Sequence, residues 1–333
     1  MTRPTASRSR FQTFWYGGPL TSYERFCLQS FLDHGHEVDL YTYDPHLVVP
    51  AGVVVCDAAQ VVPHDDVFVY QHEGFGKGSV SAFSNVFRYQ LLTDRGGWWI
   101  DTDVVCLTSE IDDNAGQYFA REDDEKVAPG TMCLTAGSPV AARCLERVVA
   151  LGRDVRWGDG GPRTFTDVLK ELGLFDRAAP PAECYPVHYS EAVDMLRPSR
   201  ANELGQRLSS AMFLHVWNST LVHAGVDKHL LPPVGSLLRM IADRHPVEGW
   251  LGEYDEHRLE RDMSLTAEVH SLTADVASLE RDRTQLLSAQ SALSAERDAV
   301  KRQLDEVTGS ISWRLTRPLR RAARYWNRRR RDR

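Results

Sequence analysis

The chain has 333 residues, 26% of them charged and 42% hydrophobic, with a net charge of −7 and a mean hydropathy of −0.37. It is long enough to bury a substantial core, but it lacks the roughly 18 consecutive apolar residues of a spanning helix and the apolar segment of a secretory signal. Residues 309–333 carry a net charge of +9 and the preceding residues sum to −16, so the acidic body is not expected to bind nucleic acid.

Residues 11–250 alternate short apolar runs with mixed helical segments, and glycine and proline interrupt them throughout. Residues 1–10 are expected to form a disordered basic terminus. The pattern then predicts strands and helices in the order strand 14–16, helix 23–34, strand 38–43, strand 52–56, helix 81–94 and strand 98–100. This order indicates an α/β domain with a mostly parallel sheet. The six cysteines form no CxxC pair, which favours free thiols in a cytoplasmic protein.

Two aspartates, Asp101 and Asp103, directly follow the apolar run 98–100. In extended backbone, residues i and i+2 point to the same side, so both carboxylates are expected to face one pocket. Two neighbouring carboxylates repel unless a cation lies between them, and oxygen ligands favour Mg²⁺ or Mn²⁺. Arg88, on the preceding helix, adds a fixed positive charge for a phosphate or sugar contact.

These residues lie in the stretches FSNVFRY, 83–89, and GGWWIDTD, 96–103. In this order they resemble the DXD-type glycosyltransferases of the GT-A class, a family that includes mannosyltransferases, galactosyltransferases and enzymes of capsular polysaccharide synthesis. The family often has Asp where this chain has Asn85. That difference removes one negative charge from the expected donor pocket.

The resemblance extends over about residues 11–244 and implies a set of functional residues. Trp15, Tyr16 and Gly17 lie in the stretch similar to the family's nucleotide-contacting first strand and turn. Gly160-Gly161-Pro162 is similar to a downstream turn, and the stretch HVWN, 215–218, to a segment that closes over the donor. The resemblance implies catalytic roles for Asp101, Asp103 and Arg88, and donor contacts from Trp15, Tyr16, Gly17, Asn85, Arg88, Asp101 and Trp217. It implies metal ligation by Asp101, Asp103, His215 and Asn218, with His215 as a ligand or a diphosphate contact.

The expected function is therefore a metal-dependent, retaining transfer of a hexose from a nucleotide-sugar to a glycan or lipid-linked acceptor in surface polysaccharide or glycolipid synthesis. A divalent cation, Mn²⁺ or Mg²⁺, would stabilise the leaving diphosphate. Two alternatives remain at this point. One is a phosphohydrolase that uses the same Asp-x-Asp pattern, and the other is a scaffold whose catalytic domain has degenerated.

Residues 256–308 contain no proline or glycine and repeat an apolar residue every seven positions. The repeated positions are Leu265, Leu272, Leu279, Leu286, Leu293, Val300 and Val307. A seven-residue apolar repeat predicts a coiled coil, and with it a homo-oligomer. The companion positions are mixed, with Arg283, Gln290 and Arg297 among them, so a single solvated helix is the alternative.

Residues 309–333 contain ten arginines interleaved with aromatic and aliphatic residues, among them Trp313, Tyr325 and Trp326. Aromatic rings beside a cationic face suit the headgroup region of an anionic bilayer. The tail is expected to hold the enzyme peripherally on the inner face of the membrane. An RNA-binding helix and a solvated tail are the alternatives.

Overall fold

The computed structural model describes residues 8–72 and 74–331, and it describes the side chains as far as residue 328. The chain divides into two compact units between Ala267 and Glu268. Among the described residues, no helix is both long and apolar enough to cross a bilayer.

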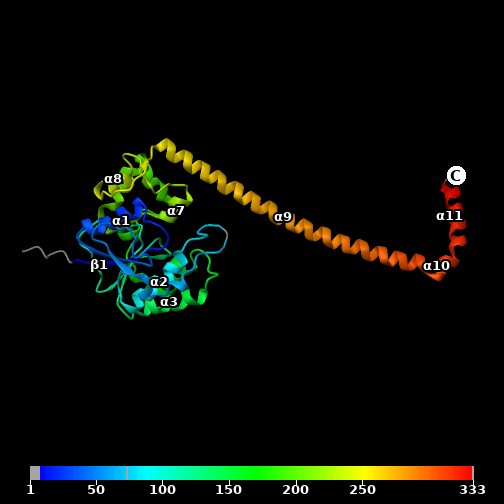
Figure 1. Ribbon diagram of the computed structural model, residues 1–333, viewed down its shortest axis with the longest axis horizontal. Coiled ribbons are helices and arrows are strands. Elements are labelled where there is room, and N and C mark those ends of the chain that lie inside the picture. Colours follow the sequence, from blue (N-terminus) through cyan, green and yellow to red (C-terminus); the bar gives the residue numbers. More distant parts are fainter. Residues whose placement is uncertain (1–7, 73, 332–333) are drawn as a thin grey trace, which may run out of the picture. The chain divides into compact units, whose positions relative to one another are not determined.

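The first unit is built on a six-stranded sheet with the strand order β3-β2-β1-β4-β7-β6. Strand β1 and several helices of this unit are labelled in Figure 1. The strands of the sheet are β1 (Arg10–Phe14), β2 (Glu37–Thr42), β3 (Val54–Asp57), β4 (Gly97–Ile100), β6 (Gln117–Arg121) and β7 (Val127–Leu134). The first four are parallel, whereas β7 runs antiparallel to both β4 and β6. The prediction of an α/β domain with a mostly parallel sheet is confirmed.

Helices and two small sheets complete this unit. The α-helices are α1 (Ser22–Asp33), α2 (Ser81–Asp94), α3 (Pro139–Leu151), α4 (Thr164–Glu171), α5 (Pro181–Cys184), α6 (Pro198–Arg207), α7 (Asn218–His223) and α8 (Leu237–Arg244). The short helical segments are η1 (Ala58–Gln60), η2 (His64–Asp66), η3 (Asp159–Arg163), η4 (Phe175–Arg177), η5 (Tyr189–Leu196) and η6 (Leu208–Ser210). The small sheets pair β5 (Val104–Cys106) with β8 (Phe213–His215), and β9 (Leu230–Leu231) with β10 (Gly252–Glu253).

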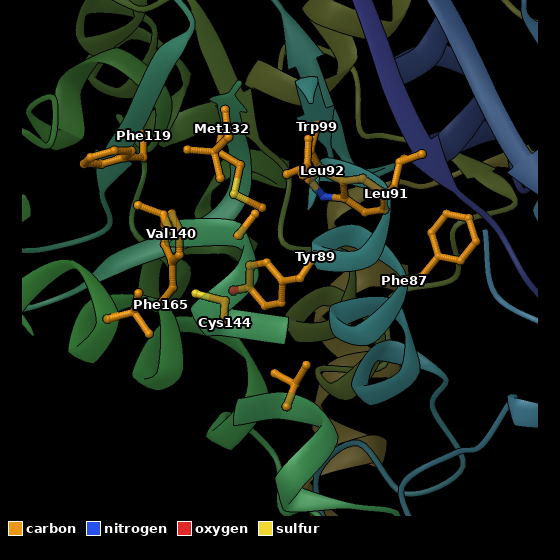
Figure 2. Close-up of a cluster of buried hydrophobic side chains, with 14 of the residues drawn as sticks. Phe87, Tyr89, Leu91, Leu92, Trp99, Phe119, Met132, Val140, Cys144 and Phe165 are labelled. Carbon is orange, nitrogen blue, oxygen red and sulfur yellow. The ribbon is translucent and has the colours of Figure 1, made fainter. Parts of the chain in front are cut away.

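The main sheet separates two apolar layers. Trp99 points toward α2, α3 and α4, where it joins the cluster drawn in Figure 2. Trp98 and Ile100, its neighbours on β4, point to the opposite face and pack with Leu28 and Phe31 of α1. This alternation covers β4 on both sides, and the strand ends at Ile100, immediately before Asp101.

Local sequence signals set several element boundaries. Helix α1 begins with a capping box, in which Thr21 and Glu24 each accept from the other's backbone N–H. Gly96 turns the chain from α2 into β4 with φ = +63°, and a Cβ there would lie 2.3 Å from the backbone nitrogen of Ala136. Only glycine fits at this position, because the conformation and the close approach both exclude a side chain.

The predicted strand boundaries were wrong near the N-terminus. The strand expected at 14–16 is β1, which begins at Arg10 and ends at Phe14, so Trp15 and Tyr16 lie in the loop that follows. Of the terminus expected to be disordered, residues 1–7 lie outside the described residues, and Arg10 already pairs with Glu37 in the sheet. Strand β1 is central in the sheet, and its residues from Phe11 to Phe14 are buried. The predicted strand therefore overlaps β1 only at Phe14.

The second unit is helical. Helix α9 (Glu256–Gly309) starts in the first unit and continues through most of the second; α10 (Ile311–Leu315) and α11 (Arg317–Arg331) follow. Ser310 caps α10 by accepting a hydrogen bond from the backbone N–H of Trp313. The seven repeated apolar side chains of α9 are all more than half exposed in the single chain, from 52% at Val307 to 70% at Leu286.

Candidate functional site

Asp101 and Asp103 lie in the turn between β4 and β5. The Asp101 backbone N–H donates to Gly130 on β7, and its carbonyl accepts from the N–H of Val104, which begins β5. The segment is therefore a turn and not the extended strand that the sequence suggested. The two carboxylates still converge, because the turn is held at one end by β7 and at the other by the pairing of β5 with β8.

The Asp101 carboxylate is held from behind by two buried groups. Its Oδ1 lies 2.9 Å from a guanidinium nitrogen of Arg88 and accepts a hydrogen bond from Trp99 Nε1, also at 2.9 Å. Arg88 is only 4% exposed and donates its other terminal nitrogen to the carbonyl of Pro129. Burial acts to raise the pKa of Asp101, but the charges of Arg88 and His215 outweigh it and keep that pKa below its ordinary value. The carboxylate therefore stays ionised, with Oδ2 left for other partners.

His215 ends β8 and faces both carboxylates. Its Nε2 lies 3.6 Å from Asp103 Oδ1 and 3.8 Å from Asp101 Oδ2, and the register of the small sheet pairs His215 with Val104. The backbone N–H of Trp217 donates to Nδ1 at 3.1 Å, which places the ring proton of neutral His215 on Nε2. Burial lowers the pKa of His215, whereas Asp103 and Asp101 raise it, and the net effect is a raised pKa.

Donor atoms from Asp101, Asp103 and His215 all lie within 4.8 Å of one another, so these residues could hold a metal ion. Gly130 provides the room for this arrangement. A Cβ on Gly130 would lie 3.1 Å from His215 Nε2 and 3.2 Å from Asp101 Oδ2. The structure thus brings together three of the four residues that the sequence suggested as metal ligands. With its ring proton on Nε2, however, neutral His215 is set to donate a hydrogen bond there, so ligation through this atom would require its proton to move.

The fourth suggested ligand, Asn218, is adjacent. Its backbone N–H donates to Asp103 Oδ2 at 2.8 Å, and its Nδ2 donates to the buried carboxylate of Glu24 at 2.7 Å. Its Oδ1 is buried and has no hydrogen-bond partner among the described residues. Trp217, just before it, adopts the left-handed conformation with φ = +61°. Non-glycine residues rarely adopt this conformation, and it is concentrated at functional sites.

Asn85 lies on α2, one turn before Arg88, and is 6% exposed. The Gly160-Gly161-Pro162 turn forms part of η3 and packs against it: a Cβ on Gly160 would lie 3.3 Å from Asn85 Nδ2. Two stretches far apart in the sequence, both noted for the family resemblance, are therefore in contact.

The nucleotide-contacting residues suggested by the sequence lie in the β1–α1 loop. Trp15 donates from Nε1 to the carbonyl of Gly18, and Tyr16 packs near Tyr43 and His64. Gly17 is exposed and has φ = +88°. Within the part of the chain that the structure describes, no hydrogen bond or ion pair links this loop to Asp101 or Asp103.

Sequence reasoning missed Gly130, and it missed Glu122 and His188, which lie near the same site. Gly130 is one of 23 glycines, and only the antiparallel placement of β7 beside β4 gives it a role. Glu122 occurs in the acidic stretch EDDE of a hairpin turn, a composition typical of any solvated turn. No local pattern distinguishes these residues.

One family model matches part of the chain. Residues 133–245 match a family model described as the alpha 1,4-glycosyltransferase conserved region. That stretch contains the turn at 160–162 and the HVWN stretch at 215–218, and it begins after Asp103. No curated protein sequence matches the chain.

Two solved structures are also similar. The PaToxG glycosyltransferase is 12% identical, with a TM-score of 0.38 over 50% of this chain and 69% of that one. The apo form of the glycosyltransferase GlyE from Streptococcus pneumoniae TIGR4 is 10% identical, with a TM-score of 0.38 over 78% of this chain and 64% of that one. Scores of this size carry no argument about the fold, so the assignment rests on the family match over residues 133–245. The chain is a glycosyltransferase.

Proposed function

We propose that this glycosyltransferase is metal-dependent and moves a hexose from a nucleotide-sugar to a glycan or lipid-linked acceptor in surface polysaccharide or glycolipid synthesis. The observation that carries the proposal is the convergence of the Asp101 and Asp103 carboxylates beside His215.

Retention of the anomeric configuration is supported by the family description, which names an α-linked product. An α-linked donor gives an α-linked product only when the configuration is retained.

The residues present fit a divalent cation. Asp101 Oδ2 and Asp103 Oδ1 both lie within 4 Å of His215 Nε2. The neighbouring Asn218, whose backbone N–H donates to Asp103, has a buried Oδ1 with no hydrogen-bond partner among the described residues. Oxygen ligands of this kind suit Mn²⁺ or Mg²⁺. When bound, the cation would neutralise the charge that develops on the diphosphate as the anomeric bond breaks.

The protein's own groups would position the donor around that place. Arg88 is buried behind Asp101, so its role is to orient this carboxylate rather than to touch the donor. His215 carries its ring proton on Nε2 and is suited to donate to a diphosphate oxygen. Asn85 and the β1–α1 loop residues Trp15, Tyr16 and Gly17 would contact the donor sugar and its nucleotide, with Trp217 closing over them.

The test is release of nucleotide from a panel of nucleotide-sugars, with and without Mn²⁺ or Mg²⁺. Asp103→Asn keeps the side-chain volume but removes the charge, and we expect it to lower release by at least about a hundredfold. Asp167→Asn, at an exposed position on α4, is the matched control and should release nucleotide like the wild type. Metal-independent release, equal rates for Asp103→Asn and wild type, or phosphate release from simple phosphomonoesters would contradict the proposal.

The helical unit is proposed to serve assembly and placement. The exposed seven-residue repeat on α9 supports pairing with a second copy of the chain.

On α10 and α11, Ile311, Leu319 and Trp326 are each more than 70% exposed beside the arginines, which supports binding to an anionic bilayer. Ending the chain at Thr308 should abolish cosedimentation with phosphatidylglycerol vesicles. Cosedimentation that survives this truncation, or stronger binding of the intact tail to RNA, would contradict membrane placement.

A further inference from the structure

A second group of polar side chains lies on the β6–β7 side of the unit. Glu122 directly follows β6, Asp123 is next to it, and His188 directly precedes η5. A carboxylate oxygen of each acid and a ring nitrogen of His188 lie within 4.8 Å of one another. Strand β7, which the hairpin after Glu122 enters, carries Gly130 past His215 and Asp101.

The Glu122 carboxylate lacks a protein partner. The residue is 7% exposed, and no hydrogen bond or ion pair joins its carboxylate to any residue that the structure describes. Burial raises the pKa of Glu122 and Asp123 raises it further, whereas Lys126, His215 and His188 lower it. The Glu122 oxygens are not among the fully enclosed side-chain atoms that lack a hydrogen bond. The carboxylate of this largely buried residue therefore still reaches the surface, where it can accept hydrogen bonds from a ligand.

Asp123 argues against a metal ion as that ligand. Its Oδ1 accepts from the backbone N–H groups of Glu125 and Lys126, both at 2.8 Å, and its Oδ2 lies 3.3 Å from Lys126 Nζ. To bind the Asp123 carboxylate, a cation would have to replace its hydrogen bonds from two backbone N–H groups and from Lys126 Nζ. It would also lie close to the positive charge of the Lys126 ammonium group. Glu122 and His188 are therefore the groups left for a ligand.

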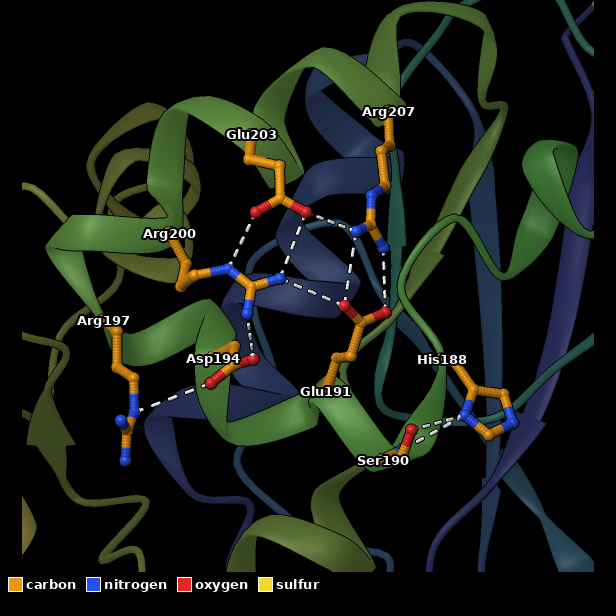
Figure 3. A network of polar contacts seen from close by, with 8 residues as sticks. All are labelled: His188, Ser190, Glu191, Asp194, Arg197, Arg200, Glu203 and Arg207. Carbon is orange, nitrogen blue, oxygen red and sulfur yellow. Dashed lines mark hydrogen bonds and ion pairs between the residues drawn. The ribbon is translucent and has the colours of Figure 1, made fainter.

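His188 is oriented as a hydrogen-bond donor. The backbone N–H of Ser190 donates to Nδ1 at 3.3 Å, and Ser190 Oγ lies 2.7 Å from the same atom (Figure 3). The proton of the neutral ring is thus on Nε2. The group then offers one strong acceptor, Glu122, and one donor, His188, which is the combination that neighbouring hydroxyl groups require.

Contacts between aromatic rings link His188 to His215, which lies beside Asp101 and Asp103. The ring of Tyr189 packs on His188 with centroids 4.0 Å apart, and it lies edge-on to Trp217 at 6.0 Å. Trp217 in turn lies 4.2 Å from the ring of His215. Tyr189 is 41% exposed, so part of its ring is free to pack against the C–H face of a sugar.

The segment that carries His188 and Tyr189 is held firmly. Glu191 in η5 accepts hydrogen bonds from Arg200 and Arg207 of α6, and Arg200 also binds Asp194 and Glu203 (Figure 3). Networks of this kind hold side chains within the tolerance that a binding site needs.

We propose that Glu122, His188 and Tyr189 form the acceptor subsite for a pyranose: Glu122 accepts from its hydroxyl groups, His188 donates to one of them, and Tyr189 packs against its apolar face. The subsite rests on the proposed function, because it supplies the sugar that receives the transferred hexose. It is defined by the chemistry of a hydroxylated ring and not by a particular linkage.

The test uses the full chain with Mn²⁺ and measures binding of methyl glucosides, galactosides and mannosides, in both anomers, by saturation-transfer NMR. We expect at least one methyl hexoside to bind the wild type, and Glu122→Gln to weaken that binding about tenfold or more. Glu125→Gln, at an exposed position in the same hairpin, is the matched control and should bind within twofold of wild type. Glu122→Gln should melt no lower than wild type, because it removes the charge of a largely buried side chain that no described residue pairs.

Two results would overturn the subsite. One is that no methyl hexoside binds the wild type, and the other is that Glu122→Gln and Glu125→Gln bind alike. Loss of a second Mn²⁺ in Glu122→Gln with unchanged sugar binding would instead identify a metal site. The Asp103→Asn variant separates this test from that of the proposed function, since it should lose nucleotide release and keep sugar binding. If the wild type releases no nucleotide while sugar binding still depends on Glu122, the transferase proposal fails and the sugar site stands.

Discussion

The site at Asp101 depends on the absence of a side chain at Gly130. A methyl group there would lie 3.1 Å from His215 Nε2 and 3.2 Å from Asp101 Oδ2, closer than ordinary contacts. Gly130→Ala should displace both side chains by a few tenths of an ångström and weaken Mn²⁺ binding about tenfold. Isothermal titration with Mn²⁺ measures this change.

The matched control is Gly205→Ala. Gly205 lies within α6, and a Cβ there would meet its nearest neighbour, Leu237, at 3.9 Å. This variant should bind Mn²⁺ like the wild type and unfold with about 1 kcal/mol more free energy, since alanine favours the helix. Equal Mn²⁺ affinity in Gly130→Ala and wild type would show that the cation does not bind beside Gly130.

The residues of the site were predictable to different degrees. Asp101 and Asp103 could be found from their spacing, although they converge through a turn and not through the two-residue period of a strand. The roles of His215 and Asn218 as metal ligands were predicted from a family resemblance and not from a local sequence pattern. Glu122 and Gly130 could not be found, because their roles arise only where β6 and β7 are placed beside β4.

At the scale of elements, the order of strands and helices was predictable because apolar runs and glycine turns alternate clearly. The helix at 81–94 has the predicted bounds, and those at 23–34 differ by one residue at each end. The antiparallel β6 and β7 were not predicted, because a strand buried on both faces has no alternating pattern that reveals its direction. The β5–β8 pairing joins residues more than 100 positions apart, which no local signal encodes.

The η5–α6 network predicts a dependence of stability on pH. Hydrogen bonds from Arg207, followed by those from Arg200, hold the pKa of Glu191 below its ordinary value of 4.5. The ionised carboxylate therefore stabilises the fold above that pH, and the contribution is lost as pH falls through the lowered pKa. Glu191→Gln should unfold with about 1 kcal/mol less free energy at pH 7, and the difference should shrink on acidification.

Urea unfolding at pH 7 and in acid measures this difference. Glu146→Gln is the control, because Glu146 forms an exposed pair with Arg143 on α3 and should change stability little at either pH. A Glu191→Gln variant whose deficit stays constant down to the acid unfolding of the wild type would show that the carboxylate charge is not the stabilising feature.

The repeat on α9 predicts self-association. Leu279 and Leu286 are 66% and 70% exposed in the single chain, and burying each in a coiled coil contributes about 1.5–3 kcal/mol. The double substitution Leu279→Glu and Leu286→Glu should therefore reduce the mass measured by light scattering to that of one chain. Ser288→Glu, off the apolar stripe, should leave it unchanged. A single-chain mass for the wild type at micromolar concentration would exclude the coiled coil.

Helix α9 belongs partly to the first unit. Leu259 is 1% exposed and lies in a core cluster with Tyr254, while Glu260 pairs with Arg197 at 2.8 Å. A chain ending at Ala267 keeps these contacts, and a chain ending at Asp255 loses them. Burial of Leu259 alone contributes about 1.5–3 kcal/mol, so the first turns of α9 stabilise the transferase unit.

Differential scanning calorimetry of the two truncated chains tests this division. The chain of residues 1–267 should keep the main transition of the full protein and its nucleotide release, because the site at Asp101 lies wholly within this unit. The chain of residues 1–255 should melt lower by about 2–4 °C for each kcal/mol lost. If both chains melt alike, α9 acts only as an extension. If residues 1–267 also fail to fold, the second unit is needed to complete the first.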